Sequence, residues 1–178
     1  MFVIQLTGLS GSGKTTLSNR VADRLKALGY AVEILDGDQY RQYLWPELTF
    51  SDRDRQENIR RLGYLAHRLA THRIIVLIAA INPFEAMRCE ISSANPGSKL
   101  IFLDCDLITL RQRDTKGLYA RSALPDGHPD KLTNLTGVNA PYERPQHPDL
   151  TIQTHRLTEA EATEKLLTFL LTNLPPQP

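Results

Sequence analysis

The chain alternates short apolar runs with longer amphipathic stretches. Runs typical of β-strands lie at residues 2–6, 31–35, 74–81, 99–103 and 150–153. Stretches with apolar residues at helical spacing separate several of them, the first at residues 14–28. Parallel strands need crossover connections, and these lay helices over both faces of the sheet. We therefore predict an α/β fold, a three-layer, doubly wound parallel sheet of about five strands.

Two further helices begin at clear N-terminal signals. Ser51 and Asp54 have the spacing of an N-cap and the third helical residue, and Thr158 and Glu161 repeat it. The helix after Ser51 is predicted to bury one apolar face and to carry arginines on the other. The helix after Thr158 is predicted to end before residues 175–178, a proline-rich tail that we expect to be disordered.

Residues 114–139 break this alternation with charged residues, glycines and prolines. A long irregular segment inside a compact domain is often functional, and many such segments close over a substrate. We predict a mobile lid here, between the fourth and fifth strands. The length of 178 residues favours one domain over residues 1–178.

Composition and charge exclude several classes of protein. With 41% hydrophobic residues the chain is not a disordered one, and a net charge of +1 gives no overall field to hold a nucleic acid. The strongest apolar run, residues 74–81, is too short to span a membrane, so we expect a cytoplasmic protein with no membrane partner. Cys89 and Cys105 are too few for a disulfide framework, and we expect both to be buried thiols.

A phosphate-binding loop is the strongest chemical signal. Residues 8–15 read Gly-Leu-Ser-Gly-Ser-Gly-Lys-Thr, between a predicted strand and a predicted helix. Glycines let backbone N–H groups converge on an anion, to which the helix N-terminus adds its positive dipole. Lys14 is predicted to neutralise the β- and γ-phosphates, and the Thr15 hydroxyl to bind Mg²⁺. The predicted nucleotide-binding residues of this loop are Gly8, Ser10, Gly11, Ser12, Gly13, Lys14, Thr15 and Thr16.

The rest of the chain separates the classes that share such a loop. It contains no Asn-Lys-x-Asp guanine-reading element, and the third strand ends without an acidic residue, which disfavours GTPases and motor ATPases. The second strand instead ends at Asp36 and Asp38, at the carboxyl edge where ligands bind in such sheets. One carboxylate could orient a hydroxyl or a metal-bound water; alternatively, both only turn the chain and cap the next short helix. Arginines between Arg41 and Arg73 favour a small anionic ligand.

Five blocks in order resemble adenylylsulfate kinase. They are residues 8–16, Asp36-Gly-Asp38 with Arg41, the arginine-rich residues 50–61, residues 113–119 and residues 136–143. The resemblance implies a phosphate-loop kinase fold and transfer of the ATP γ-phosphate to the 3′-hydroxyl of adenosine 5′-phosphosulfate. It also implies ATP and adenosine 5′-phosphosulfate as partners, Mg²⁺ as cofactor, and leaves a homodimer open.

Residue roles follow from the same resemblance. Asp36 matches the carboxylate that orients the 3′-hydroxyl, and Phe50 matches an aromatic that stacks on the acceptor adenine. Arg113 begins the segment that closes over ATP, where Lys116 adds positive charge. The remaining acceptor-binding residues implied are Asp38, Arg41, Arg55, Asn58, Ile81 and Leu135, and Lys116 is counted with them.

Two departures from the family pattern bear on activity. Asn82 stands where the family commonly has serine, so no phosphoryl group can be carried there and direct transfer remains. Leu135 stands where a phenylalanine is common, so Leu135→Phe is predicted to tighten acceptor binding about two- to twelvefold by restoring a stacked pair. Two alternatives remain at this point. One is a kinase of the same fold for a nucleoside, nucleotide or sugar acid, and the other is a nucleotide-binding regulatory module without transfer activity.

Overall fold

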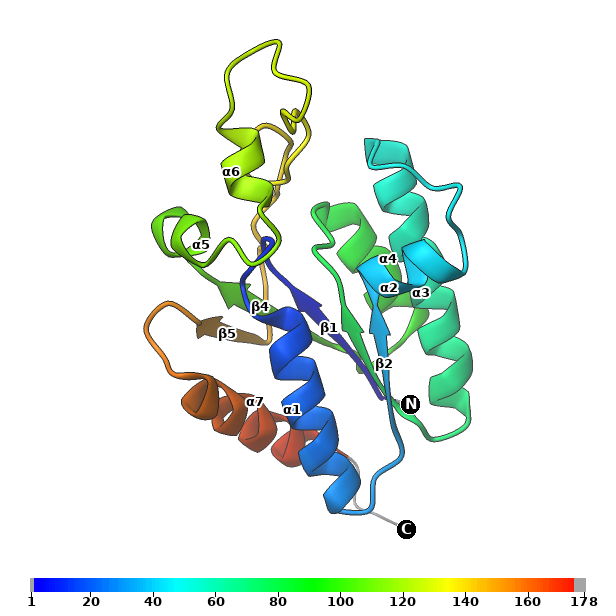
Figure 1. Cartoon of the computed structure of the whole chain (residues 1–178). Coiled ribbons are helices and arrows are strands. Elements are labelled where there is room, and N and C mark those ends of the chain that lie inside the picture. Colours follow the sequence, from blue (N-terminus) through cyan, green and yellow to red (C-terminus); the bar gives the residue numbers. More distant parts are fainter. Residues whose placement is uncertain (1, 175–178) are drawn as a thin grey trace.

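The computed structural model describes residues 2–174, and these form a parallel sheet between helical layers (Figure 1). The strands are β1 (Phe2–Thr7), β2 (Val32–Asp36), β3 (Ile75–Ala79), β4 (Lys99–Asp104) and β5 (Leu150–Gln153). The helices are α1 (Lys14–Ala27), α2 (Gly37–Tyr43), α3 (Asp52–Thr71), α4 (Glu85–Ala94), α5 (Leu107–Arg113), α6 (Leu118–Ser122) and α7 (Glu159–Asn173). The predicted α/β class and five-stranded sheet are confirmed.

The sheet has the order β2-β3-β1-β4-β5, and each of its four pairings is parallel. Strand β1 is central, with Ile4 opposite Leu77 on one side and Lys99 on the other. The chain leaves β1 toward β2 and later crosses to β4 on the opposite side. Such a reversal places the ligand-binding crevice at the carboxyl ends of the strands.

The two faces of the sheet have separate cores because successive strand residues point to opposite sides. Leu77 of β3 is buried on the face covered by α1 and α7, whereas Ile78 is buried on the face covered by α3 and α4. Figure 1 shows the same arrangement, with α1 and α7 side by side on one face. The doubly wound, three-layer prediction is confirmed.

The two helix starts that the N-cap spacings predicted are present in the structure. Ser51 accepts a hydrogen bond from the Asp54 N–H at 3.2 Å, and Thr158 forms a complete capping box with Glu161. The third strand is shorter than the predicted 74–81, because the chain turns away from the sheet after Ala79. Asn82 sits in that turn with a positive φ of 44°, a conformation that asparagine tolerates better than most residues.

Three helices were not predicted. Helix α4 has no side-chain N-cap hydrogen bond and few buried apolar residues, so neither signal marks it. Helix α5 does begin with a cap, since Asp106 accepts from the Thr109 N–H at 2.8 Å. Helix α6 lies inside the excursion of residues 114–139, which projects beyond the sheet edge (Figure 1).

Two smaller expectations have different outcomes. Cys105 is buried as predicted, but Cys89 is exposed on α4, so that half of the prediction is wrong. The predicted tail at 175–178 lies outside the described residues. Among residues 2–174, no helix is long and apolar enough to cross a membrane.

Candidate active site

The phosphate loop joins β1 to α1 at the carboxyl edge of the sheet. Gly8 has φ +154°, and a Cβ there would lie 2.6 Å from the Leu103 carbonyl oxygen, so a larger residue would displace the loop. Gly13, with φ 95°, ends the loop at the N-terminus of α1, a helix long enough to present its positive dipole end. The loop therefore has the backbone geometry that an anion-binding nest requires.

Lys14 lies across this loop. Its Nζ donates to the carbonyl oxygens of Gly8 and Leu9 at 2.9 and 2.8 Å. Desolvation lowers the pKa of Lys14 from 10.5 to about 8, although the charges of Asp38 and Asp36 oppose the shift. The ammonium thus lacks a full counter-charge, and nucleotide phosphates would supply one.

The lowered pKa predicts proton uptake on nucleotide binding at alkaline pH. Below about pH 8 Lys14 is already protonated, whereas above it the empty site increasingly holds a neutral amine that must regain a proton before it pairs with phosphate. The ATP dissociation constant should rise by up to tenfold per pH unit between about pH 8 and 10. Calorimetry at pH 7 and pH 9, in buffers of different ionisation enthalpy, measures the uptake. Equal uptake at the two pH values would contradict the assignment to Lys14.

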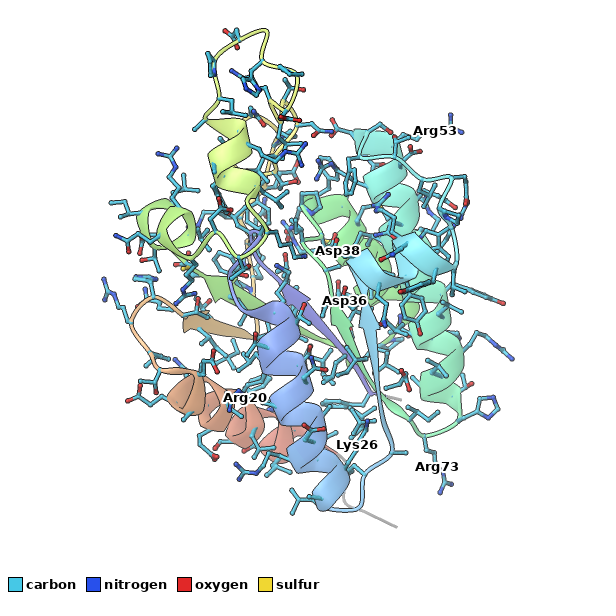
Figure 2. The ribbon with its side chains drawn as sticks, in the orientation of Figure 1. Arg20, Lys26, Asp36, Asp38, Arg53 and Arg73 are labelled. Carbon is cyan, nitrogen blue, oxygen red and sulfur yellow. The ribbon has the colours of Figure 1, made fainter. Side chains whose placement is uncertain are left out.

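Asp36 connects the phosphate loop to the acceptor side. Its Oδ2 accepts from the Thr15 hydroxyl at 2.8 Å, and its Oδ1 accepts from the N–H groups of Asp38 and Gln39 at 3.0 and 3.2 Å. Asp36 therefore caps α2, as the alternative interpretation proposed, and also faces the candidate metal ligand. Figure 2 shows Asp36 and Asp38 at the carboxyl end of β2, where α2 begins.

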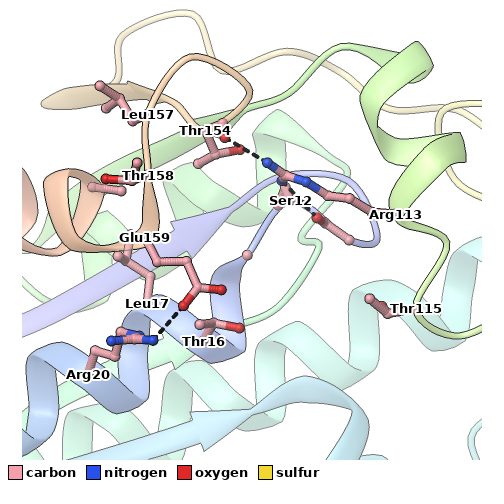
Figure 3. Close-up of a pocket in the computed structure, with 13 residues that line it drawn as sticks. Ser12, Thr16, Leu17, Arg20, Arg113, Thr115, Thr154, Leu157, Thr158 and Glu159 are labelled. Carbon is pink, nitrogen blue, oxygen red and sulfur yellow. Dashed lines mark hydrogen bonds and ion pairs between the residues drawn. The ribbon is translucent and has the colours of Figure 1, made fainter.

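A cavity of about 290 Å³ lies on one side of the loop (Figure 3). Arg113 closes it by donating to the Thr154 carbonyl at 2.8 Å, while Arg20 and Glu159 form an ion pair of 2.5 Å across its other end. Ser12 of the phosphate loop and Thr16 of α1 also line it. Arg113 thus lies beside the phosphate loop, and its contact with ATP stays a prediction.

A smaller cavity, of about 40 Å³, lies on the other side. Phe50 lines it, 52% exposed, beside two arginines that are each only 9% exposed. The guanidinium carbons of Arg41 and Arg55 lie 4.9 and 5.7 Å from the centre of the Phe50 ring. Burial lowers the pKa of both guanidinium groups, although arginine stays charged.

Neither arginine is neutralised by an ion pair within residues 2–174. Arg41 donates to the Thr49 carbonyl at 2.5 Å, and Arg55 donates to the carbonyls of Phe50 and Asn134 at 2.8 and 2.5 Å. Arg55 also donates to the Thr136 hydroxyl. Two buried guanidinium groups without a direct ion pair therefore stand in one cavity, with Asp38, Asp52 and Asp54 close enough to stabilise their charges only in part. Such a site favours a small anion.

A third cavity, of about 170 Å³, joins the other two. It contains Lys14, Thr15 and Asp36, shares Gly11 and Gly13 with the large cavity, and shares Asp38 and Ile81 with the small one. The line of cavities therefore passes from Arg113, over the phosphate loop, to Phe50. This is the order that a nucleotide and a phosphoryl acceptor need for in-line transfer.

Two predicted acceptor residues have other partners here. Asn58 is buried, and its Oδ1 accepts from the Trp45 indole N–H at 2.6 Å. Trp45, 7% exposed, thus packs against the body of the protein. Lys116 forms an ion pair with Asp38 between the excursion and α2, beside the phosphate loop.

Leu135 is not brought together with Phe50. It is 4% exposed, packs with Cys105, Leu110 and Tyr119, and lines none of the three cavities in the described part of the chain. Its contact with the acceptor base therefore stays a prediction.

This burial changes the result expected for Leu135→Phe. A larger ring in a filled cluster should lower the free energy of unfolding by about 1–3 kcal/mol, whereas Leu135→Met, of similar volume, should cost less than about 1.5 kcal/mol. Denaturant unfolding and acceptor titration of both variants measure the two effects. An acceptor bound two- to twelvefold more tightly by Leu135→Phe, without loss of stability, would instead support the stacked pair.

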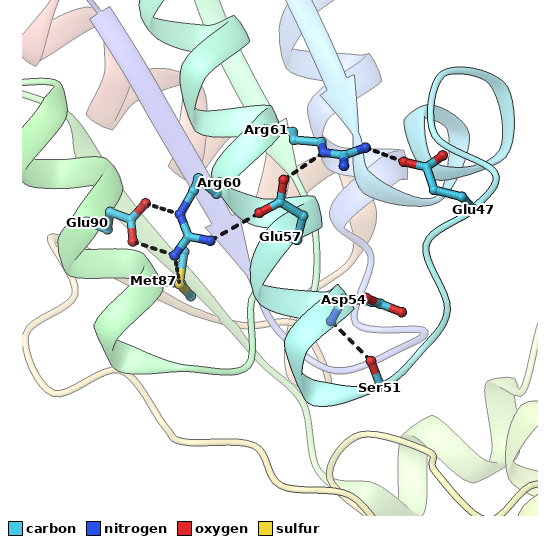
Figure 4. A network of polar contacts seen from close by, with 8 residues as sticks. All are labelled: Glu47, Ser51, Asp54, Glu57, Arg60, Arg61, Met87 and Glu90. Carbon is cyan, nitrogen blue, oxygen red and sulfur yellow. Dashed lines mark hydrogen bonds and ion pairs between the residues drawn. The ribbon is translucent and has the colours of Figure 1, made fainter.

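Two surface arginines of the arginine-rich stretch, Arg60 and Arg61, do not belong to the site. Arg60 pairs with Glu57 and Glu90, and Arg61 pairs with Glu57 and Glu47, on the outer side of α3 (Figure 4). Their charges are already compensated, and exposed pairs of this kind contribute little. Arg60 and Arg61 are therefore poor candidates for binding an anion, in contrast to the buried Arg41 and Arg55.

Some site residues were missed because they are distant in sequence. The Tyr119 hydroxyl donates to the Ser10 carbonyl at 2.8 Å, and burial raises the pKa of Tyr119 to about 12, so it remains a donor. The pKa of Cys105 is also raised, chiefly by burial and to a lesser extent by the nearby carboxylates. No local spacing signals these contacts.

The fold and the row of cavities define a phosphate-loop kinase for a small acceptor. The model of the adenylylsulphate kinase family matches residues 1–153, and the chain belongs to this family. Adenylyl-sulfate kinase of Chloroflexus aurantiacus is 43% identical over 94% of this chain and 88% of its own. That of Deinococcus deserti is 38% identical over 96% and 92%. APS kinase of Mycobacterium tuberculosis, solved with AMPPNP and APS, superimposes with a TM-score of 0.86 at 34% identity, over 95% of this chain and 96% of the other.

Proposed function

We propose that the protein transfers the γ-phosphate of ATP to the 3′-hydroxyl of adenosine 5′-phosphosulfate, giving 3′-phosphoadenosine 5′-phosphosulfate and ADP. The observation that carries this proposal is that Arg41 and Arg55, buried and without an ion pair among residues 2–174, lie beside the exposed ring of Phe50. An acceptor that combines an aromatic base with a small anionic group matches this cavity. A phosphoryl acceptor without a base or without an anion would use only part of it.

ATP is proposed to bind with its base beside Arg113 and its phosphates on the loop. The Thr15 hydroxyl and the Asp36 carboxylate, 2.8 Å apart at the phosphate cavity, are oxygen ligands that suit Mg²⁺. Thr15 would hold the ion, which supplies neutralisation of phosphate charge. Lys14 adds its own positive charge to the β- and γ-phosphates.

Asp36 is proposed to orient the attacking 3′-hydroxyl and to accept its proton, with Asp38 beside it. Phe50 stacks on the acceptor adenine, and the two buried arginines bind the phosphosulfate. The acceptor cavity is far smaller than such a molecule. We therefore propose that the segment containing Asn134, whose carbonyl accepts a hydrogen bond from Arg55, moves when the acceptor binds. We propose that residues 114–139 act as the lid, with Lys116 exchanging Asp38 for nucleotide phosphate.

Mass detection of the product tests the function directly. The protein is incubated with Mg-ATP and adenosine 5′-phosphosulfate, and in parallel with labelled ATP and a panel of nucleosides, nucleotides and sugar acids. We expect labelled product with adenosine 5′-phosphosulfate alone. Faster transfer to another acceptor would favour a different kinase of this fold, and nucleotide binding without any transfer would favour a regulatory module.

A further inference from the structure

A buried arginine outside the three cavities holds the turn that divides two of them. Arg88 of α4 is 1% exposed, one of the largest fully buried side chains among the described residues. Its Nη1 donates to the Asn82 carbonyl at 2.6 Å, and its Nη2 donates to the Glu143 carbonyl at 2.7 Å. Glu85 supplies the counter-charge, with its Oε2 2.7 Å from the Arg88 Nε.

The turn of residues 81–83 is the wall between the phosphate cavity and the acceptor cavity. Ile81 lines both, and Asn82 and Pro83 line the acceptor cavity. The turn has little regular structure of its own, because β3 ends at Ala79 and Asn82 adopts the left-handed φ of 44°. Its position therefore depends on the hydrogen bonds that reach it from outside.

Those bonds converge on one network. The Thr7 hydroxyl donates to the Ile81 carbonyl at 2.6 Å, while the Glu143 N–H donates to the Pro83 carbonyl at 2.9 Å. The Glu85 N–H in turn donates to the Glu143 carboxylate at 2.6 Å. Arg88 binds the backbone of both the turn and the segment that directly follows the excursion, and Thr7 also contacts both, the second through the Tyr142 hydroxyl at 3.1 Å.

We propose that Arg88 is a positioning residue for the acceptor. It fixes the 81–83 turn against the segment that returns from the excursion, so that the acceptor cavity has its walls in place when the anion binds. Lysine in its place keeps a positive charge for Glu85 but cannot span two carbonyls with one planar fork. The ATP-binding cavity is formed by the phosphate loop, to which Arg88 makes no hydrogen bond in the described part of the chain, so the affinity for ATP should change little.

The experiment compares three variants with the wild type. Arg88→Lys removes the bidentate hold, and Glu143→Ala removes the exposed carboxylate that binds the Glu85 N–H without leaving a buried charge unpaired. Arg60→Gln is the matched control, because Arg60 pairs with glutamates on an outer helix face and lines none of the three cavities of the site. Steady-state kinetics, calorimetry with an unreactive ATP analogue and with adenosine 5′-phosphosulfate, and thermal unfolding are measured for each.

We expect Arg88→Lys to raise the acceptor KM and lower kcat by about tenfold each, since small displacements of a bound reactant are costly in rate. Glu143→Ala should move both in the same direction by less, and Arg60→Gln should move neither. The affinity for the ATP analogue should stay within about twofold in all three. If Arg88→Lys does not fold, the acceptor KM and kcat of Glu143→Ala alone test the proposal, and unchanged values would overturn it.

Two results would overturn the proposal and leave Arg88 a structural residue only. One is an equal loss of affinity for the acceptor and for the ATP analogue. The other is a lower melting temperature with unchanged kinetic constants at temperatures where the variant is folded. The inference rests on the proposed function, yet the two can fail separately. If the wild type shows no transfer to adenosine 5′-phosphosulfate, the proposed reaction fails. In that case the Arg88 proposal is still tested by whether Arg88→Lys weakens binding of the acceptor more than binding of the ATP analogue.

Discussion

Lys14→Ala is expected to reduce turnover by about 10³-fold or more while the protein stays folded. Removing one preorganised donor from a developing anion costs about 10²–10³ in rate, and here a full positive charge is lost as well. In the empty protein the same lysine is costly, because desolvation lowers its pKa to about 8. The free energy of unfolding should therefore change by no more than about 1 kcal/mol, the worth of an ordinary hydrogen bond.

Lys26→Ala provides the control, since Lys26 lies near the other end of α1 and is exposed (Figure 2). Product formation, ATP-analogue binding and denaturant unfolding are measured for both variants. Lys26→Ala should match the wild type in all three. A folded Lys14→Ala protein that turns over at the wild-type rate would remove the phosphate loop from the mechanism.

The parts of the molecule that could be predicted from sequence are those encoded by short spacings. The phosphate loop, the cap of α3 and the capping box of α7 each lie within a few consecutive residues, and the structure contains all three. The strand order follows less directly, but continuous apolar runs require cover on both faces, which limits the topology to a wound sheet. Short-range sequence signals therefore predicted the phosphate loop, these helix starts and the sheet class well.

Contacts between distant segments could not be predicted in this way. Arg88 meets Glu143 across 55 residues, and Arg55 meets Thr136 across 81. Helix α4, which carries Arg88, lacks a capping signal and has few buried apolar residues, so its partners became visible only in three dimensions. The same holds for Leu135, whose sequence position suggested a ligand but whose neighbours are a small apolar cluster.

Asp36→Asn should lower kcat by about 10²–10⁴, the usual contribution of a positioned general base, while ATP binding changes little. The fold should tolerate the change because an amide oxygen can still accept from the N–H groups of Asp38 and Gln39 that Asp36 now caps. The Thr15 hydroxyl can rotate to accept from the new amide group instead of donating to Oδ2. What the amide cannot do is take the proton of a 3′-hydroxyl.

Asp38→Asn distinguishes the roles of the two carboxylates, since Asp38 pairs with Lys116 whereas Asp36 accepts from the Thr15 hydroxyl. If Asp36 is the base, Asp36→Asn should lose at least about tenfold more in kcat than Asp38→Asn, whose main effect should fall on the acceptor KM. Asp23→Asn, at an exposed position of α1, should leave both constants unchanged. Single-turnover rates with saturating ATP and acceptor isolate the transfer step from binding. A loss below about tenfold for Asp36→Asn, with a larger loss for Asp38→Asn, would assign proton transfer to Asp38 and leave Asp36 as the cap of α2 and the partner of Thr15.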